Sequence, residues 1–257
     1  LIAALSELLD LADGIAWATA LAFIRIGAMV ALMPGLGDPS VPQRVKLALV
    51  VAFTLVVAPL LAERIGSGQA DPSFLALGGE AVAGLLLGVG MRLFVVALQT
   101  AAAIIAQATT LSQLFAGAAP EPQPAIGNLF LMAGIALAMA AGLHVRAAEL
   151  VLLSYELLPA GSPLPAASAT DWGLALIGRT FALAFSLAAP FVLASLIYNL
   201  ALGVINRAMP ALMVSMVGAP ALTLGALALM AVATPVLLMA WLDAFSGHMA
   251  DPFAVAP

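Results

Sequence analysis

The chain has 257 residues, of which 64% are hydrophobic and 8% are charged, and its formal net charge is −5. Soluble globular proteins carry roughly a quarter of their residues as charges, so this composition excludes a free-standing soluble enzyme and a disordered segment. Eight basic residues provide no basic stripe for nucleic acid. The absence of cysteine excludes thiol catalysis, disulfides and cysteine metal ligands. An integral membrane protein remains.

Six apolar runs are long enough to cross a bilayer, which needs about 20 residues per helix. They lie at 15–33, 45–62, 74–105, 126–158, 172–205 and 219–245. Alanine and leucine dominate, and the alternating pattern of a transmembrane barrel is absent. The sequence therefore predicts an all-α membrane protein of about six hydrophobic helices, several of them kinked or broken. Acidic residues stand where a cleavable signal would be basic, so we expect no such signal. These are Glu7, Asp10 and Asp13.

The third and fourth runs each exceed 30 residues and carry ionisable groups. Glu80 and Arg92 lie on the third run, and the fourth contains His144, Arg146, Glu149 and Glu156. A charge at the bilayer centre costs about 2.5–3.5 kcal/mol on insertion scales. We therefore expect protein partners, rather than lipid, around these helices.

One face of the third run combines charges with small residues. Glu80, Gly84, Gly88 and Arg92 recur every four residues. The Gly84 and Gly88 pair allows another backbone to approach closely. Glu80 and Arg92 are separated by about 18 Å on a helix, so we expect that they do not pair with each other.

Two connecting segments stand out. The first, 33–44, holds three prolines and two glycines and is predicted to be a rigid turn. The second, 107–125, contains three prolines together with Leu111, Leu114 and Phe115. A long apolar loop is tolerated at membrane depth only when it is buried in protein or lines a cavity. This segment is either a disordered connection or a functional loop inserted into another structure.

The fifth run ends in Asn199–Pro210, and the last helix is expected to begin near Pro220. Pro190 and Pro235 fall inside apolar runs, where they are expected to kink their helices. An interrupted helix with Asn206 and Arg207 at the break can form an ion or substrate site. It can equally be a structural corner in an assembly.

Signatures of catalysis are missing from the sequence. It contains no His-Glu-x-x-His motif, no Walker loop and no Gly-x-Ser-x-Gly elbow. The two histidines, His144 and His248, are more than 100 residues apart. We expect no enzymatic activity, no metal site and no cofactor.

Several motifs occur in the order found in one known family. They are Phe23-x-Arg25-Ile-Gly-Ala-Met, Met33-Pro-Gly-Leu-Gly-Asp-Pro-Ser-Val-Pro42, Glu80 with Gly84-Leu-Leu-Leu-Gly88, Gly142-Leu-His144, Ser154-Tyr155 with Leu158-Pro159-x-Gly161, Ala189-Pro190, Asn199-Leu-Ala-Leu-Gly-Val-Ile-Asn206-Arg207-Ala-Met-Pro210 and Val217-Gly-Ala-Pro220. Through them the chain resembles the FliR family over nearly its whole length, and the flagellar branch fits better than the virulence-secretion branch. Ala211 departs from the glutamine expected after the proline.

The resemblance implies a component of the flagellar type III export gate, in the bacterial inner membrane at the basal body. Members of the family are similar to a fusion of a FliP-like part, here 1–165 with four helices, and a FliQ-like helical hairpin, here 166–257. They complete a helical ring with FliP and FliQ, through which unfolded flagellar subunits pass. FlhA and FlhB lie on the cytoplasmic side, and nucleic acid has no role.

The resemblance also implies roles for individual residues. Segment 107–125 corresponds to the family's plug, and Leu111, Leu114 and Phe115 are expected to form its apolar tip, because bulky side chains exclude water and ions. Residues expected to contact other subunits are Glu80, Gly84, Gly88, Arg92, Asn206, Arg207 and Pro210. Two alternatives remain: a structural anchor with no pore role, and a stand-alone permease that uses Asn199, Asn206 and Arg207.

Overall fold

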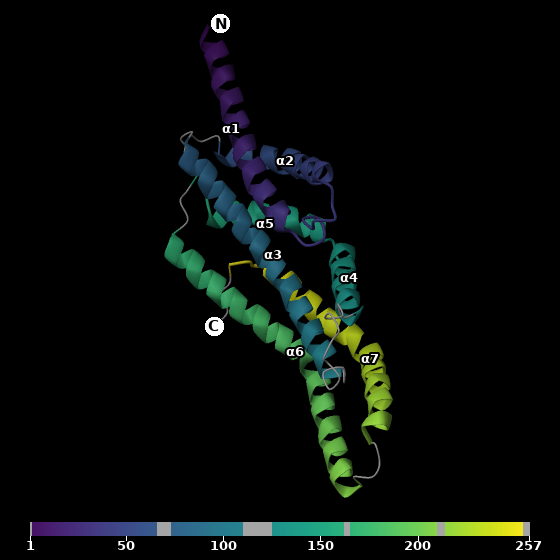
Figure 1. The fold of residues 1–257 in the computed structure, drawn as a ribbon. Helices are drawn as coiled ribbons and strands as arrows, with labels where there is room; N and C mark the ends of the chain where they lie inside the picture. Colours follow the sequence, from purple (N-terminus) through teal and green to yellow (C-terminus); the bar gives the residue numbers. More distant parts are fainter. Residues whose placement is uncertain (1, 66–72, 110–124, 162–164, 210–213, 254–257) are drawn as a thin grey trace. The chain divides into compact units, whose positions relative to one another are not determined.

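The computed structural model describes residues 2–65, 73–109, 125–161, 165–209 and 214–253. Every regular element in these ranges is a helix (Figure 1). The helices are α1 (Ile2–Leu32), α2 (Gln43–Ile65), α3 (Phe74–Thr109), α4 (Ala125–Ala140), α5 (Leu143–Leu157), α6 (Ala166–Ala208) and α7 (Val214–Ala250). Alanine and leucine have the highest helix propensities, and they fill these segments. The predicted all-α class is confirmed for the described part of the chain.

Within the described ranges, five helices are long and apolar enough to cross a membrane. They lie in α1, α2, α3, α6 and α7, and the bent pair α4 and α5 gives a sixth when it is counted as one span. This agrees with the prediction of about six hydrophobic helices.

Several boundaries differ from the sequence-based expectation. The α1 helix begins at Ile2 rather than at 15, and α6 begins at Ala166 rather than at 172. The fourth run, 126–158, is two helices bent by 69° rather than one. The break falls at Gly142, whose φ of 83° belongs to the left-handed region that glycine adopts without a steric penalty. The last helix begins at Val214, before the expected Pro220. Residues 107–109, expected in a loop, form the last turn of α3.

Two prolines expected to kink their helices lie within continuous helical segments. The α6 helix runs through Pro190 and α7 runs through Pro235. The kinks themselves stay predictions.

A hydrogen-bonded turn joins α1 and α2 where the sequence predicted a rigid connection, at 33–44. The amide of Gly37 donates to the carbonyl of Met33 over 2.8 Å and continues the capping of α1. A Cβ at Gly37 would lie 2.6 Å from the carbonyl oxygen of Val30, so only glycine fits there. The Lys46 ammonium donates to the Gly37 carbonyl over 2.7 Å, which places a cation near the C-terminal end of α1.

The chain divides into two compact units, each with its own core. The first unit comprises residues 1–93, 139–176 and 246–257. In it, α1 packs against α2, and the fully buried side chains include Leu21, Met29, Leu61 and Met91.

The second unit comprises residues 94–138 and 177–245. Its largest buried side chains are Phe130, Phe191 and Trp241. The Trp241 indole stacks on Phe245 at 5.3 Å and donates to the Phe94 carbonyl over 2.9 Å. A buried indole N–H therefore has the acceptor that its burial requires.

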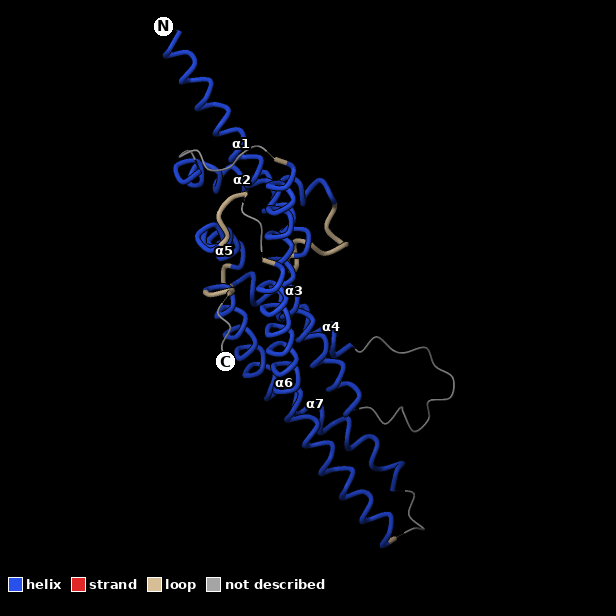
Figure 2. Tube along the Cα trace, turned by 90° about the vertical axis from the view of Figure 1, so that its left-hand side faces the viewer, coloured by secondary structure: helices blue, strands red, loops and turns tan. Residues whose placement is uncertain are grey.

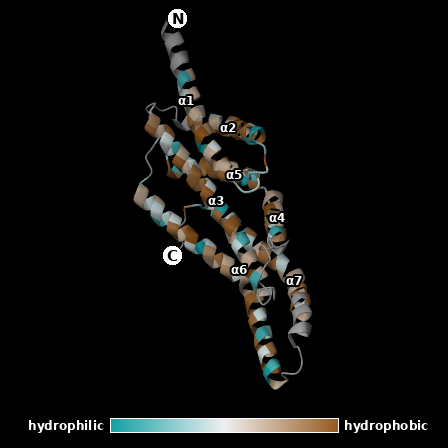
Figure 3. Cartoon of the chain, in the orientation of Figure 1, coloured by the Kyte–Doolittle hydropathy of each residue, from teal (hydrophilic) through white to brown (hydrophobic). Residues whose placement is uncertain are grey.

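Most residues of the described helices are apolar, as the hydropathy colouring in Figure 3 shows, and many of the large ones are exposed. On α6, Leu196, Ile197 and Leu200 are each more than 60% exposed, and on α7, Val232 and Val236 are similar. Apolar exposure on this scale is typical of surfaces that meet lipid or another protein.

Candidate functional site

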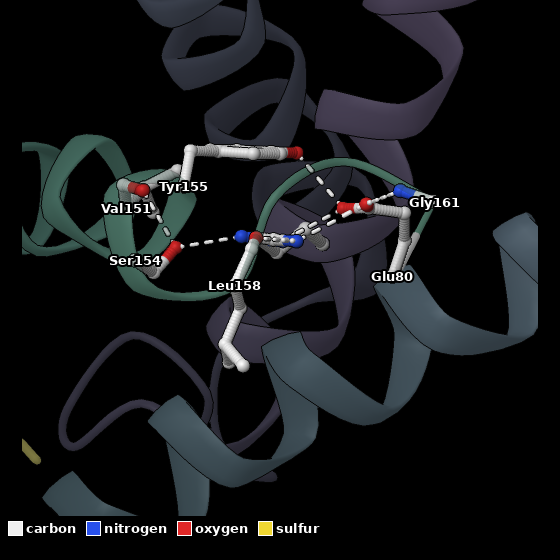
Figure 4. Close-up of polar contacts among 7 residues, drawn as sticks. Glu80, Val151, Ser154, Tyr155, Leu158 and Gly161 are labelled. Atoms are coloured by element: carbon white, nitrogen blue, oxygen red, sulfur yellow. Dashed lines mark hydrogen bonds and ion pairs between the residues drawn. The ribbon is translucent and has the colours of Figure 1, made fainter. Parts of the chain in front are cut away.

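The most polar buried feature of the described chain is an ion pair between α1 and α3. The guanidinium of Arg25 meets the carboxylate of Glu80 through two hydrogen bonds, from Nε to Oε2 over 2.7 Å and from Nη2 to Oε1 over 3.1 Å (Figure 4). Both residues are only 1% exposed. This two-point geometry matches the planar fork of arginine to the two carboxylate oxygens.

Each Glu80 oxygen accepts a second hydrogen bond. The hydroxyl of Tyr155 donates to Oε2 over 2.9 Å, and the amide of Gly161 donates to Oε1 over 3.0 Å. The carboxylate thus has four donors, and it needs them because a buried charge without hydrogen bonds is very costly.

Arg25 is equally well satisfied. Beyond Glu80, its Nη1 donates to Ser154 Oγ and its Nη2 to the Leu158 carbonyl, both over 3.0 Å. Its guanidinium also lies 3.6 Å from the centre of the Tyr155 ring, a favourable contact for a cation on an aromatic face. The Ser154 hydroxyl in turn donates to the Val151 carbonyl over 2.6 Å.

These contacts define a buried polar cluster of Arg25, Glu80, Ser154, Tyr155 and the 158–161 turn. It joins α1, α3 and the end of α5, as Figure 4 shows. Gly161 has a φ of 73°, which aims its amide at Glu80 in a conformation that glycine favours. The cluster holds both ends of this turn, at Leu158 and at Gly161, and so fixes the path of the chain where it leaves α5.

A second ion pair lies nearer the surface of the same unit. Arg92 on α3 donates from Nη1 to Asp38 Oδ1 over 2.9 Å, and the two side chains are 39% and 30% exposed. Asp38 belongs to the turn between α1 and α2, so this pair ties that turn to α3. Its exposure leaves part of the guanidinium available to other groups.

Comparison with known proteins identifies the family. The profile described as "Bacterial export proteins, family 1" matches residues 16–248. "Flagellar biosynthetic protein FliR" of Caulobacter vibrioides is 34% identical over 236 residues, which cover 89% of this chain and 93% of that protein.

The chain belongs to the FliR family of bacterial export proteins. The protein of the same name from Escherichia coli K12 is 31% identical over 83% of each chain. That from Pectobacterium carotovorum is 28% identical over 80% of each.

In this FliR family member, the close-approach face of α3 is occupied by α1. A Cβ at Gly84 would overlap the carbonyl oxygen of Arg25, and one at Gly88 would lie 2.8 Å from Leu32 Cβ. The backbone contact that the glycine spacing predicted is therefore made, and it lies within the chain. Glu80 pairs with Arg25 and Arg92 pairs with Asp38, so the two do not pair with each other, as expected.

Three other sequence-predicted site residues, Asn199, Asn206 and Arg207, belong to the second unit. Asn206 and Arg207 are exposed in the last turn of α6. Asn199 donates to Ser195 Oγ over 3.2 Å, and Ser195 donates to the Ala108 carbonyl over 2.7 Å. Leu111, Leu114, Phe115 and Pro210 lie outside the described residues.

Sequence reasoning did not select Arg25, Ser154 and Tyr155 as site residues. Each stood inside a motif shared with the family, and Gly161 did too. The signal that would have found them is chemical. An arginine in the middle of an apolar helix requires a carboxylate partner. Glu80, also in an apolar helix, requires a cation, so the two residues could have been matched from the sequence.

Proposed function

We propose that this chain is a core component of the flagellar type III export gate, which with FliP and FliQ forms the inner-membrane channel for unfolded flagellar subunits. The observation that carries the proposal is the family match over residues 16–248, together with relatives named flagellar biosynthetic protein FliR. Five or six apolar helices in the described chain support a multi-pass location in the membrane. FlhA and FlhB are the proposed neighbours on the cytoplasmic side.

The surface of the described helices supports assembly with other subunits. Arg92 lies near the middle of the 35-residue apolar stretch of α3 and is 39% exposed. An exposed cation at that depth is costly against lipid but not against a polar protein surface or a hydrated channel. We therefore keep Arg92 as a proposed subunit-contact residue. Glu80, Gly84 and Gly88 of the same helix make their contacts with α1 inside the chain.

The end of α6 offers a second proposed contact. Asn206 and Arg207 are exposed there, followed by Pro210. In this proposal the arginine, near the C-terminal end of its helix, meets an acceptor on a neighbouring subunit.

The proposed division of the chain is a FliP-like part, 1–165, and a FliQ-like hairpin, 166–257. It is supported by the start of α6 at Ala166, directly after the turn that the buried polar cluster holds. The hairpin would then consist of α6 and α7.

We also propose that Leu111, Leu114 and Phe115 close the channel as an apolar plug. Deletion of 111–117 should make cells permeable to ions or small solutes, because bulky apolar groups block a pore by excluding water. Unchanged membrane permeability, with normal amounts of the deleted protein in the membrane, would contradict the plug.

The experiment that tests the proposed function is co-purification. The tagged chain is produced with neighbouring FliP- and FliQ-like proteins, extracted in mild detergent and weighed by native mass spectrometry. A discrete assembly with one copy of this chain and several of each partner supports the gate. A stable monomer that takes up a specific solute with saturation supports a permease instead. An assembly in which deletion of 107–125 changes nothing supports an anchor.

A further inference from the structure

The α2 helix has one apolar side that nothing in the first unit covers. It runs without a break from Gln43 to Ile65, and its candidate membrane span is Gln43–Leu61 (Figure 2). One side packs against α1 and α5, where Val57 and Leu61 are buried. On the other side every exposed large side chain is aliphatic. We call this side the outward face of α2, and its large residues are Val45, Leu47, Val51, Leu55, Val56 and Leu60.

The outward face offers no hydrogen-bonding side chain to an occupant. Lys46 and Thr54 are the only polar residues in 45–60, and both are bonded within the chain. The Lys46 ammonium donates to the Gly37 carbonyl over 2.7 Å. The Thr54 hydroxyl donates to the Val50 carbonyl over 2.7 Å. A polar group placed on this face would lose its hydrogen bonds to water and gain none, so the face suits an apolar occupant.

A single cation lies at the beginning of the outward face. Arg44, in the first turn of α2, is exposed, and no hydrogen bond or ion pair joins it to another residue of the described ranges. At about 100° per residue, Arg44, Val51 and Leu55 lie within about 40° of one another around the helix axis. The guanidinium and the apolar side chains therefore share one side of the helix.

The length of this arrangement matches one leaflet of a bilayer. At 1.5 Å per residue, Arg44 and Leu55 are separated by about 17 Å along the helix axis. The hydrocarbon core is about 30 Å thick, so one leaflet contributes about 15 Å. An acyl chain attached to a phosphate at Arg44 would therefore cover the face as far as Leu55. The methylene groups of arginine can stay on apolar surface while its charge reaches the headgroups.

We propose that the outward face of α2 binds an anionic phospholipid, with the phosphate at Arg44 and an acyl chain along Val51 and Leu55. Arginine can donate two parallel hydrogen bonds to a phosphate. A headgroup with net negative charge is favoured over a zwitterionic one, because the guanidinium attracts the first and is repelled by the ammonium of the second. The proposed export function assigns no role to this face, and the lipid site does not depend on that function.

A second copy of this chain is a poor occupant of the same face. Copies inserted in the same direction would pair their α2 helices in parallel, about a two-fold axis. The two Arg44 side chains would then face each other, and like charges repel. A phospholipid instead brings the opposite charge to the same position.

Photolabelling of the full chain tests the site, with the chain alone and with its FliP- and FliQ-like neighbours co-produced. The probe is phosphatidylglycerol with a diazirine in its acyl chain, present as a small fraction of phosphatidylcholine vesicles. After irradiation, mass spectrometry should locate the label on α2 around Val51 and Leu55. Unlabelled phosphatidylglycerol should displace it, and the same diazirine on phosphatidylcholine should label this stretch about fivefold less.

Two outcomes of the labelling would overturn the site. Equal labelling of α2 by the two probes would show that the headgroup charge is not recognised. Loss of the label from α2 when the neighbours are assembled on the chain would show that protein, rather than lipid, covers the outward face.

Variants of Arg44 test the phosphate contact. Arg44→Gln should lower the phosphatidylglycerol label on α2 about fivefold, the factor expected for one basic residue near an anionic membrane surface. Arg44→Lys keeps the charge and should retain most of the label. The matched control, Arg179→Gln, removes an exposed cation from α6 and should leave the α2 label unchanged. An undiminished label in Arg44→Gln, at equal amounts of inserted protein, contradicts the proposal.

Discussion

Arg25 and Glu80, which are 55 positions apart in the chain, face each other at 2.7 Å between α1 and α3. Neither charge is accessible to water, and the surrounding donors and acceptors come from α5 and the turn that follows it. Such a pair adds little net stability over an apolar pair of the same size, but the loss of one partner leaves an uncompensated buried charge. The contacts of α1, α3 and α5 around this pair therefore depend on one another, because separating any of the three helices leaves a buried charge without part of its partners.

The first prediction concerns this pair. Arg25→Gln should lower the free energy of unfolding by about 3–5 kcal/mol, because the Glu80 carboxylate is then buried without a counter-charge. Denaturant unfolding of the purified chain in mild detergent measures the effect. The control is Asp38→Asn in the half-exposed pair with Arg92, where we expect a change of about 1 kcal/mol or less. Equal effects of the two variants would contradict the burial argument.

The second prediction separates the hydroxyl of Tyr155 from its ring. Tyr155→Phe keeps the ring against Arg25 but removes the hydrogen bond to the Glu80 carboxylate, so it should cost about 1.5–3 kcal/mol. Tyr155→Leu removes both contacts and should cost more. The same unfolding experiment compares the two variants. If they are equally destabilised, the contact of the cation with the ring contributes nothing.

The third prediction concerns the glycines between α3 and α1. Gly84→Ala and Gly88→Ala should each cost about 1–3 kcal/mol, since the new methyl group meets backbone or Cβ atoms of α1 that have no freedom to move. Gly78→Ala, on the same helix with nothing within 4 Å of the new methyl group, should stabilise instead, by about 0.5–1 kcal/mol. No loss of stability at Gly84 and Gly88 would show that α1 and α3 are not in close contact. A loss at Gly78 would show that the new methyl group meets a neighbour there.

The fourth prediction concerns the break between α4 and α5. A methyl group at Gly142 would touch nothing within 4 Å, so a substitution there reports on backbone strain alone. With a φ of 83°, Gly142→Ala should cost about 1–2 kcal/mol, and Gly142→Asn should cost less. The unfolding free energies of the two variants test this order. A stabilised Gly142→Ala variant would indicate that the two helices are continuous.

Much of the fold could be predicted because membrane insertion acts on local composition. Hydropathy alone located the apolar helices, and the prolines and glycines of 33–44 located the first turn. The break at Gly142 was missed because a single glycine in an apolar run is compatible with a continuous helix. Only the left-handed φ of that residue distinguishes the two cases.

The site was harder to predict. The glycine spacing in α3 predicted a close backbone contact. Spacing alone does not identify the helix that makes the contact, and the structure shows that it is α1. The sequence marked Glu80 as a costly charge in an apolar helix. Because that cost is the same wherever the partner lies, it could not identify Arg25 as the partner.

The sequence by itself determined that this protein is helical, belongs in a membrane and has the motifs of its family, because these properties depend on neighbours along the chain. Only the tertiary structure decided that Arg25, Glu80, Tyr155 and Gly161 form one cluster. Those residues come from segments far apart in the sequence, and their pairing follows from the packing of three helices and from the requirement that a buried charge be satisfied.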